Sequence, residues 1–89
     1  MEIIYMPRAQ SDITNMKKSG NVALMKKAQA LLVEIAINPY FGTGKPEQLK
    51  YDLSGYWSRR INKEHRIIYK VLEETDTIEI YSLQGHYEN

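Results

Sequence analysis

The chain has 89 residues, of which 43% are hydrophobic and 26% charged, and its formal net charge is +1. These values are typical of one ordinary globular domain and argue against extensive disorder. Cysteine is absent, which excludes disulfides and thiolate nucleophiles, and the two histidines, His65 and His86, lack metal-ligand spacing. No apolar run is long enough to span a bilayer and no signal pattern is present, so we expect a cytoplasmic protein without membrane contact.

The N-terminal part of the chain predicts a strand followed by two helices. Residues 2–6 (EIIYM) form a short apolar run rich in β-branched and aromatic residues, and Pro7 ends it. Apolar residues at helical spacing then predict a first helix that ends at Ser19-Gly20, and a second, longer helix that Asn21 caps and Asn38-Pro39 ends. The apolar positions of these helices are Ala9, Ile13, Met16, Leu24, Ala28, Leu31, Leu32 and Ile35.

The C-terminal part of the chain has the period of two that is typical of strands. A loop is expected first, because residues 39–46 contain two prolines and two glycines. The predicted strands after it are 49–53, 57–61, 66–72 and 77–83, with turns at Ser54-Gly55 and Glu73–Asp76. We therefore predict an α+β fold in a single domain, residues 1–89. A small antiparallel sheet, mixed at one strand, would pack on two N-terminal helices in the order β-α-α-β-β-β(-β).

Basic side chains are concentrated in residues 45–70, where seven basic residues stand against three acidic ones, so that the segment is net +4. Aromatic rings are interleaved with these charges, which favours a surface that binds a polyanion and stacks bases. The rings are Tyr51, Tyr56, Trp57 and Tyr69. Arg59 and Arg60 lie on opposite sides of the predicted strand, so one of them could instead pack its stem on Trp57 or pair with an acidic side chain. The acidic candidates are Asp52 and Glu64.

Three residues from separate elements could converge on one face of the sheet: Glu47, Arg66 and His86. A carboxylate, a guanidinium and an imidazole suffice for RNA cleavage without a metal, because they provide a base, a fixed cation and an acid. Each also has an ordinary interpretation, since Glu47 alone could be a solvated loop carboxylate and His86 a residue of a frayed terminus. His65 is most simply a turn residue with a hydrogen-bonded ring.

The stretch GTGKPEQLKYDLSGYWSRRINKEHRIIYKV, together with the GHY near the C-terminus, resembles the YoeB-like (Txe/YoeB) toxins of type II toxin–antitoxin modules, within the RelE/ParE superfamily. The resemblance is specific over residues 39–72 and at the C-terminus. Over the first 38 residues mainly the strand-helix-helix layout agrees. It implies a RelE-like fold and a ribosome-dependent mRNA endonuclease that inhibits translation.

The resemblance also implies roles for individual residues. Glu47 would be the general base, Arg66 would stabilise the phosphate, and His86 would be the general acid, assisted by Tyr87. The residues implied to bind RNA are Lys50, Arg59 and Arg60. Cleavage would need no metal or cofactor and would leave a 2′,3′-cyclic phosphate or 3′-phosphate and a 5′-hydroxyl. The implied partners are a cognate antitoxin, the ribosome with its mRNA, and a second copy of the chain in a homodimer.

Two other functions stay open from the sequence. The chain could be a non-catalytic member of the superfamily that binds a partner protein, or a toxin with another target, as in gyrase-poisoning relatives. The joint presence of Glu47, Arg66 and His86 favours the nuclease, because a binding module would not need all three.

Overall fold

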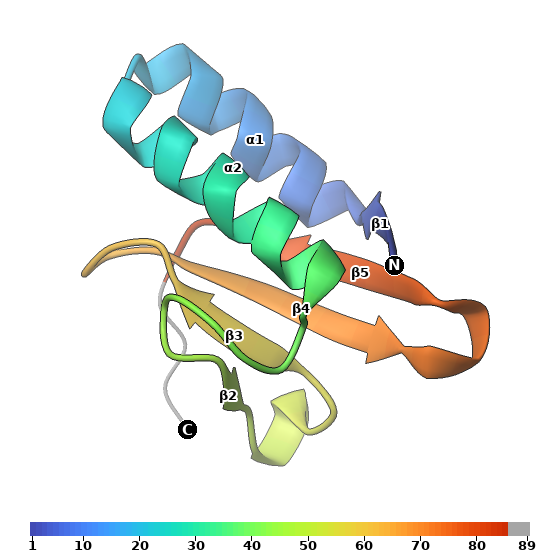
Figure 1. Ribbon diagram of the computed structural model, residues 1–89. Helices are drawn as coiled ribbons and strands as arrows, with labels where there is room; N and C mark the ends of the chain where they lie inside the picture. Colours follow the sequence, from blue (N-terminus) through green and yellow to red (C-terminus); the bar gives the residue numbers. More distant parts are fainter. Residues whose placement is uncertain (86–89) are drawn as a thin grey trace.

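The computed structural model describes residues 1–85 (Figure 1). Its elements in chain order are β1 (Glu2–Tyr5), α1 (Pro7–Ser19), α2 (Val22–Ile37), β2 (Glu47–Gln48), β3 (Trp57–Arg60), β4 (Arg66–Leu72) and β5 (Thr77–Ser82), with 3₁₀ turns at Tyr51–Leu53 and Glu73–Thr75. Within this part of the chain, no helix combines the length and the apolar character needed to cross a membrane.

The five strands form one sheet in the order β1-β5-β4-β3-β2. β1 is parallel to β5, and every other pair is antiparallel, so the sheet is mixed at one strand as predicted. Both helices lie on the same side of this sheet (Figure 1). The predicted α+β architecture is confirmed, and neither α1 nor α2 covers the opposite face of the sheet (Figure 1).

The helices begin and end at residues that favour helix termini. Pro7 occupies the first turn of α1, Gly20 ends that helix in the left-handed conformation, and the Asn21 side chain accepts a hydrogen bond from the Leu24 N–H at 3.1 Å to cap α2. The apolar stripes of the helices then pack on the inner face of β4 and β5. This core includes Met16, Leu31, Ile35, Ile67, Tyr69, Ile78 and Ile80.

The predicted strand at 49–53 is wrong. Only Glu47 and Gln48 pair with β3, and the following residues 51–53 form a 3₁₀ turn that begins at Tyr51, whose φ is +56°. The alternation of Leu49, Tyr51 and Leu53 looks like a strand, but a left-handed residue turns the chain out of the sheet. Leu49 alone is buried from this trio, and Tyr51 is 81% exposed.

Candidate active site

The register of β2, β3 and β4 places three of the predicted site residues on one face. Glu47 is directly opposite Ser58, and Arg60 is directly opposite Arg66. Opposed residues project to the same side of a sheet, and so do residues two apart on one strand. Glu47, Arg60 and Arg66 therefore share the face that the helices leave open, while the alternate positions of β3 and β4 project into the core.

The spacing on this face suits a phosphodiester group. Glu47 and Arg66 are separated by two strand intervals across the sheet and by two residues along it, which corresponds to roughly 12 Å between their Cα atoms. Side chains of this length can approach a phosphate from both sides across such a gap. Glu47 and Arg60 are exposed and Arg66 is half-buried, so these three side chains are accessible to a ligand on this face. Lys50 is also exposed and lies two residues after the end of β2.

The loop before Glu47 is pressed against β3. The Arg60 N–H donates a hydrogen bond to the Gly44 carbonyl at 2.7 Å. Gly44 has a φ of +85°, and a Cβ at this position would lie 2.7 Å from the Arg60 carbonyl oxygen. Only glycine permits both the backbone conformation and this approach, and the contact fixes where the chain enters β2 with Glu47.

Arg59 has a structural environment rather than an RNA-facing one. Its side chain is fully buried, with Nη1 3.3 Å from Glu34 Oε1 and Nε 3.3 Å from the Tyr69 hydroxyl. Nη2 donates to the carbonyl oxygens of Asn38 and, at 2.7 Å, Phe41. The prediction that Arg59 contacts RNA is wrong, because its donors are already bonded inside the protein.

The sequence did contain a signal for this role. Arg59 has the same strand parity as Trp57 and Ile61, which marks the core side of β3. One member of the arginine pair is thus structural, as the alternative interpretation allowed. Its acidic partner is Glu34 of α2. The sequence had suggested Asp52 or Glu64, and that prediction is wrong.

The ionisable groups around Arg59 are tuned by their contacts. The Thr43 N–H donates to Glu34 at 3.0 Å and, with help from Arg59, lowers the pKa of that carboxyl below its usual value. Burial raises the pKa of Tyr69, whose hydroxyl donates to the Pro39 carbonyl at 2.6 Å. These bonds tie the loop between α2 and β2 to the core.

The aromatic rings that the sequence grouped together divide between the two faces. Tyr69 is buried, and Trp57 packs on Tyr40 with ring centroids 5.1 Å apart. Tyr56 lies on the open face, where it meets Tyr81 edge-on at 5.8 Å and Lys70 lies 5.5 Å from its ring centre. Base stacking by the whole set is therefore ruled out by the burial of Tyr69.

His86 and Tyr87 lie outside the described residues, but the residue before them is placed. The Arg66 N–H donates to the Gly85 carbonyl at 3.1 Å. The chain that leads into His86 therefore begins beside the first residue of β4. Among residues 1–85, no group of three or more His, Cys, Asp or Glu side chains is arranged to hold a metal ion.

A family model described as a YoeB-like toxin of bacterial type II toxin–antitoxin systems matches residues 5–87. The chain belongs to this family. The resemblance stated from the sequence is thereby confirmed, and the match spans both helices and the whole sheet. The RelE-like fold that the resemblance implied agrees with this membership.

Individual YoeB-like proteins agree with this over most or all of their length. The chain is similar to Toxin YoeB of Streptomyces coelicolor, with 39% identity over 87 residues that cover 98% of this chain and 100% of the relative. Toxin YoeB of Synechocystis is 48% identical over 65 residues, 73% of each chain.

Solved structures of YoeB-like toxins superpose closely on the fold. A YoeB/ParE toxin from Agrobacterium tumefaciens gives a TM-score of 0.91 at 32% identity, covering 98% of this chain and 100% of the other. The toxin in a YoeB-YefM complex from Staphylococcus aureus gives 0.84 at 41% identity, covering 98% of both.

Proposed function

We propose that this YoeB-like toxin is a ribosome-dependent endoribonuclease that cleaves mRNA during translation and so inhibits translation. The observation that carries the proposal is the shared open face of Glu47, Arg60 and Arg66, with the peptide that leads to His86 hydrogen-bonded beside Arg66. A carboxylate, two guanidiniums and an imidazole that can gather there form a complete set for RNA cleavage.

In the proposed reaction the RNA supplies its own nucleophile. Glu47 removes the proton of a 2′-hydroxyl, and the 2′-oxygen attacks the adjacent phosphorus. Arg66 stabilises the negative charge on the non-bridging oxygens. His86, assisted by Tyr87, protonates the leaving 5′-oxygen as the phosphorus–5′-oxygen bond breaks. The products are a 2′,3′-cyclic phosphate and a 5′-hydroxyl, and hydrolysis of the cyclic ester gives a 3′-phosphate.

Lys50 and Arg60 complete the proposed RNA contact, because both are exposed next to the site. With a net charge of +1, the protein attracts RNA only modestly and in a salt-dependent way. A site of this kind gains most from a scaffold that presents the RNA strand with its 2′-hydroxyl aligned for attack. The ribosome is that scaffold in our proposal, with mRNA as the substrate.

We also propose a cognate antitoxin and a homodimer as assemblies of this chain. Related toxins from Staphylococcus aureus were solved as a YoeB-YefM complex and as a YoeB dimer. Apolar side chains that could enter such interfaces are exposed on α2, where Val33 is 61% and Ile37 80% exposed.

The experiment that tests the function is expression in a translating cell-free extract, with 5′-end mapping of a reporter message. We expect ribosome-dependent cuts within codons, and Glu47→Ala and His86→Ala should each slow cleavage by about 10²- to 10⁴-fold. Arg66→Ala should be at least as severe. Lys63→Ala is the control, because Lys63 is an exposed basic residue in the turn before β4.

Two results would overturn the proposal. If translation stops while the message stays intact, the chain is a binder or a toxin with another target. If Glu47→Ala and His86→Ala cut at the parental rate, cleavage belongs to other residues. Equal losses in all four variants, Lys63→Ala included, would indicate misfolding or a general charge effect in place of acid–base chemistry.

A further inference from the structure

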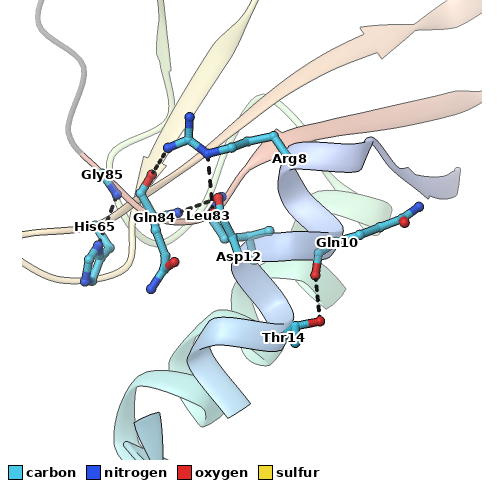
Figure 2. Close-up of polar contacts among 8 residues, drawn as sticks. All are labelled: Arg8, Gln10, Asp12, Thr14, His65, Leu83, Gln84 and Gly85. Carbon is cyan, nitrogen blue, oxygen red and sulfur yellow. Dashed lines mark hydrogen bonds and ion pairs between the residues drawn. The ribbon is translucent and has the colours of Figure 1, made fainter. Parts of the chain in front are cut away.

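The last described residues are held by a buried carboxylate from α1 (Figure 2). Asp12 is only 4% exposed, and its Oδ2 accepts hydrogen bonds from the N–H groups of Leu83, at 2.9 Å, and Gln84, at 3.1 Å. Its other oxygen accepts from Arg8 Nε at 3.3 Å, and Arg8 Nη2 lies 3.4 Å from the Gln84 carbonyl oxygen. Both backbone groups of Gln84 are therefore bonded to α1.

The next residue is held from the other side, by the start of β4. The Gly85 N–H donates to His65 Nδ1 at 3.1 Å (Figure 2). The Gly85 carbonyl accepts from the Arg66 N–H, also at 3.1 Å. Because Nδ1 is the acceptor, the neutral His65 ring carries its proton on Nε2. Asn62 Oδ1 accepts from the His65 N–H at 2.8 Å, and this fixes the turn that presents the ring.

These contacts hold a segment that lies outside the sheet. β5 ends at Ser82, so residues 83–85 lie beyond the sheet, and yet both backbone groups of Gln84 and of Gly85 are hydrogen-bonded. Placing a carboxylate among the core residues of a helix is costly unless it gains strong hydrogen bonds. Asp12 accepts from two residues that are 71 and 72 positions away in sequence, and only Gly85 separates them from His86.

We propose that Asp12 and His65 are positioning residues that act through His86. This inference rests on the proposed function, in which His86 is the general acid. The Gly85 carbonyl carbon is bonded to the His86 nitrogen, so the hydrogen bond from the Arg66 N–H fixes the point from which the chain continues into the proposed acid. A group that transfers a proton must be held within a fraction of an ångström of its working position, and a displacement of about 1 Å can cost 10²-fold in rate.

The first test compares cleavage rates for variants that remove or keep the acceptors. His65→Leu removes the acceptor, whereas His65→Asn keeps an oxygen at the position of Nδ1. We expect the maximal single-turnover rate on programmed ribosomes to fall about 10- to 100-fold for His65→Leu and for Asp12→Ala. His65→Asn should stay near the parent, and the ribosome concentration at half-maximal rate should not change.

Thr14→Ala is the control on the same helix, because the exposed Thr14 hydroxyl donates only to the Gln10 carbonyl within α1 (Figure 2). It should cleave like the parent. Thermal unfolding and circular dichroism check each variant for folding. If Asp12→Ala does not fold, the comparison of His65→Leu with His65→Asn still decides, since the turn that carries His65 is partly exposed.

The second test asks whether the effect passes through His86. In a His86→Ala background, His65→Leu should cause no further loss, whereas in a Glu47→Ala background it should reduce the residual rate by the same factor as in the parent. Hydrogen exchange of the Gly85 amide, measured by NMR in the His86→Ala protein, gives a readout independent of activity. Its protection should be lost in His65→Leu and kept in His65→Asn.

The outcomes separate the two proposals. A parent that leaves the message intact refutes the proposed function, and the positioning role with it. A parent that cuts, together with a folded His65→Leu that cuts equally fast, refutes the positioning role alone. The positioning role also fails if His65→Leu lowers the rate equally in the His86→Ala background, because the residue then acts on something other than the acid.

Discussion

Replacing Arg59 by methionine separates a structural arginine from an RNA-binding one. Methionine keeps most of the aliphatic stem and removes the guanidinium, so the Asn38 and Phe41 carbonyls lose their donor. Each buried acceptor left without a partner costs about 1–3 kcal/mol, partly offset because a desolvated charge is removed as well. We expect a net loss of about 3 kcal/mol. This is a large part of the roughly 4–13 kcal/mol expected for a chain of this size.

The loss can be measured by urea unfolding in the His86→Ala background, which avoids toxicity. Trp57, the single tryptophan, reports on β3 through its fluorescence. In thermal unfolding the midpoint should fall by roughly 12–24 °C, at 4–8 °C per kcal/mol for a domain of this size. Arg60→Met is the matched control, since the neighbouring side chain is exposed. Its stability should change by less than about 0.5 kcal/mol.

RNA binding should show the opposite pattern, because Arg60 is exposed and Arg59 is not. In the active protein, Arg60→Met should slow cleavage and weaken its salt dependence, because one phosphate contact is lost. The reasoning is refuted if Arg59→Met unfolds at the parental urea concentration while RNA binding weakens as much as in Arg60→Met. That result would mean that the Arg59 guanidinium faces solvent and RNA.

Two further predictions concern the same loop. Burial raises the pKa of Tyr69 above 10.0, so the stability that its protonated form provides is complete below pH 10 and is lost as the pH rises further. Melting temperatures should therefore fall more steeply above pH 10 in the parent than in Tyr69→Phe, and equal slopes would contradict the assignment. Gly44→Ala should lower both the melting temperature and the cleavage rate, because its Cβ would meet the Arg60 carbonyl. Gly20→Ala, also at positive φ but with no atom within 4 Å, should cost only about 1 kcal/mol and leave cleavage intact.

Local sequence signals were sufficient for most of the fold. Helix ends follow from Gly20 and the Asn21 cap, and the last three strands follow from alternation and turn residues. Alternation failed at residues 49–53, because period two cannot distinguish a strand from a turn when one residue, Tyr51, adopts a left-handed backbone. Strand pairing beyond sequence neighbours, such as β1 beside β5, is a non-local result that periodicity could not predict.

The site also combines residues that local sequence could predict with contacts between distant residues that it could not. Glu47 and Arg66 were predicted as site residues because their residue types and the motif of the resemblance lie in one contiguous stretch. The contact of Asp12 with Leu83 joins residues 71 apart, and nothing in the spacing of α1 marks Asp12 as different from a solvated acid. The structural role of Arg59 could have been predicted, because Arg59 lies on the same side of β3 as Trp57. Its pairing with Glu34 could not, because Glu34 lies on α2.

Buried charge explains how so small a domain can position both ends of the proposed site. A chain of this length has little apolar material to cover long loops. The loop after α2 is instead fixed by Arg59, which is 0% exposed and bonds the carbonyls of Asn38 and Phe41. The segment after β5 is fixed by Asp12, which is 4% exposed and bonds two backbone N–H groups.

The signs of these two charges match what each loop offers, since a guanidinium donates to carbonyls and a carboxylate accepts from amides. One loop leads to Glu47, the proposed base, and the other leads to His86, the proposed acid. Removing either charge should therefore misplace one catalytic group and leave the other in position. Arg59→Met should then suppress the residual cleavage of His86→Ala but add little in Glu47→Ala, and the reverse should hold for Asp12→Ala. Losses of equal size in both backgrounds would show that the two loops are coupled through the core and do not act separately.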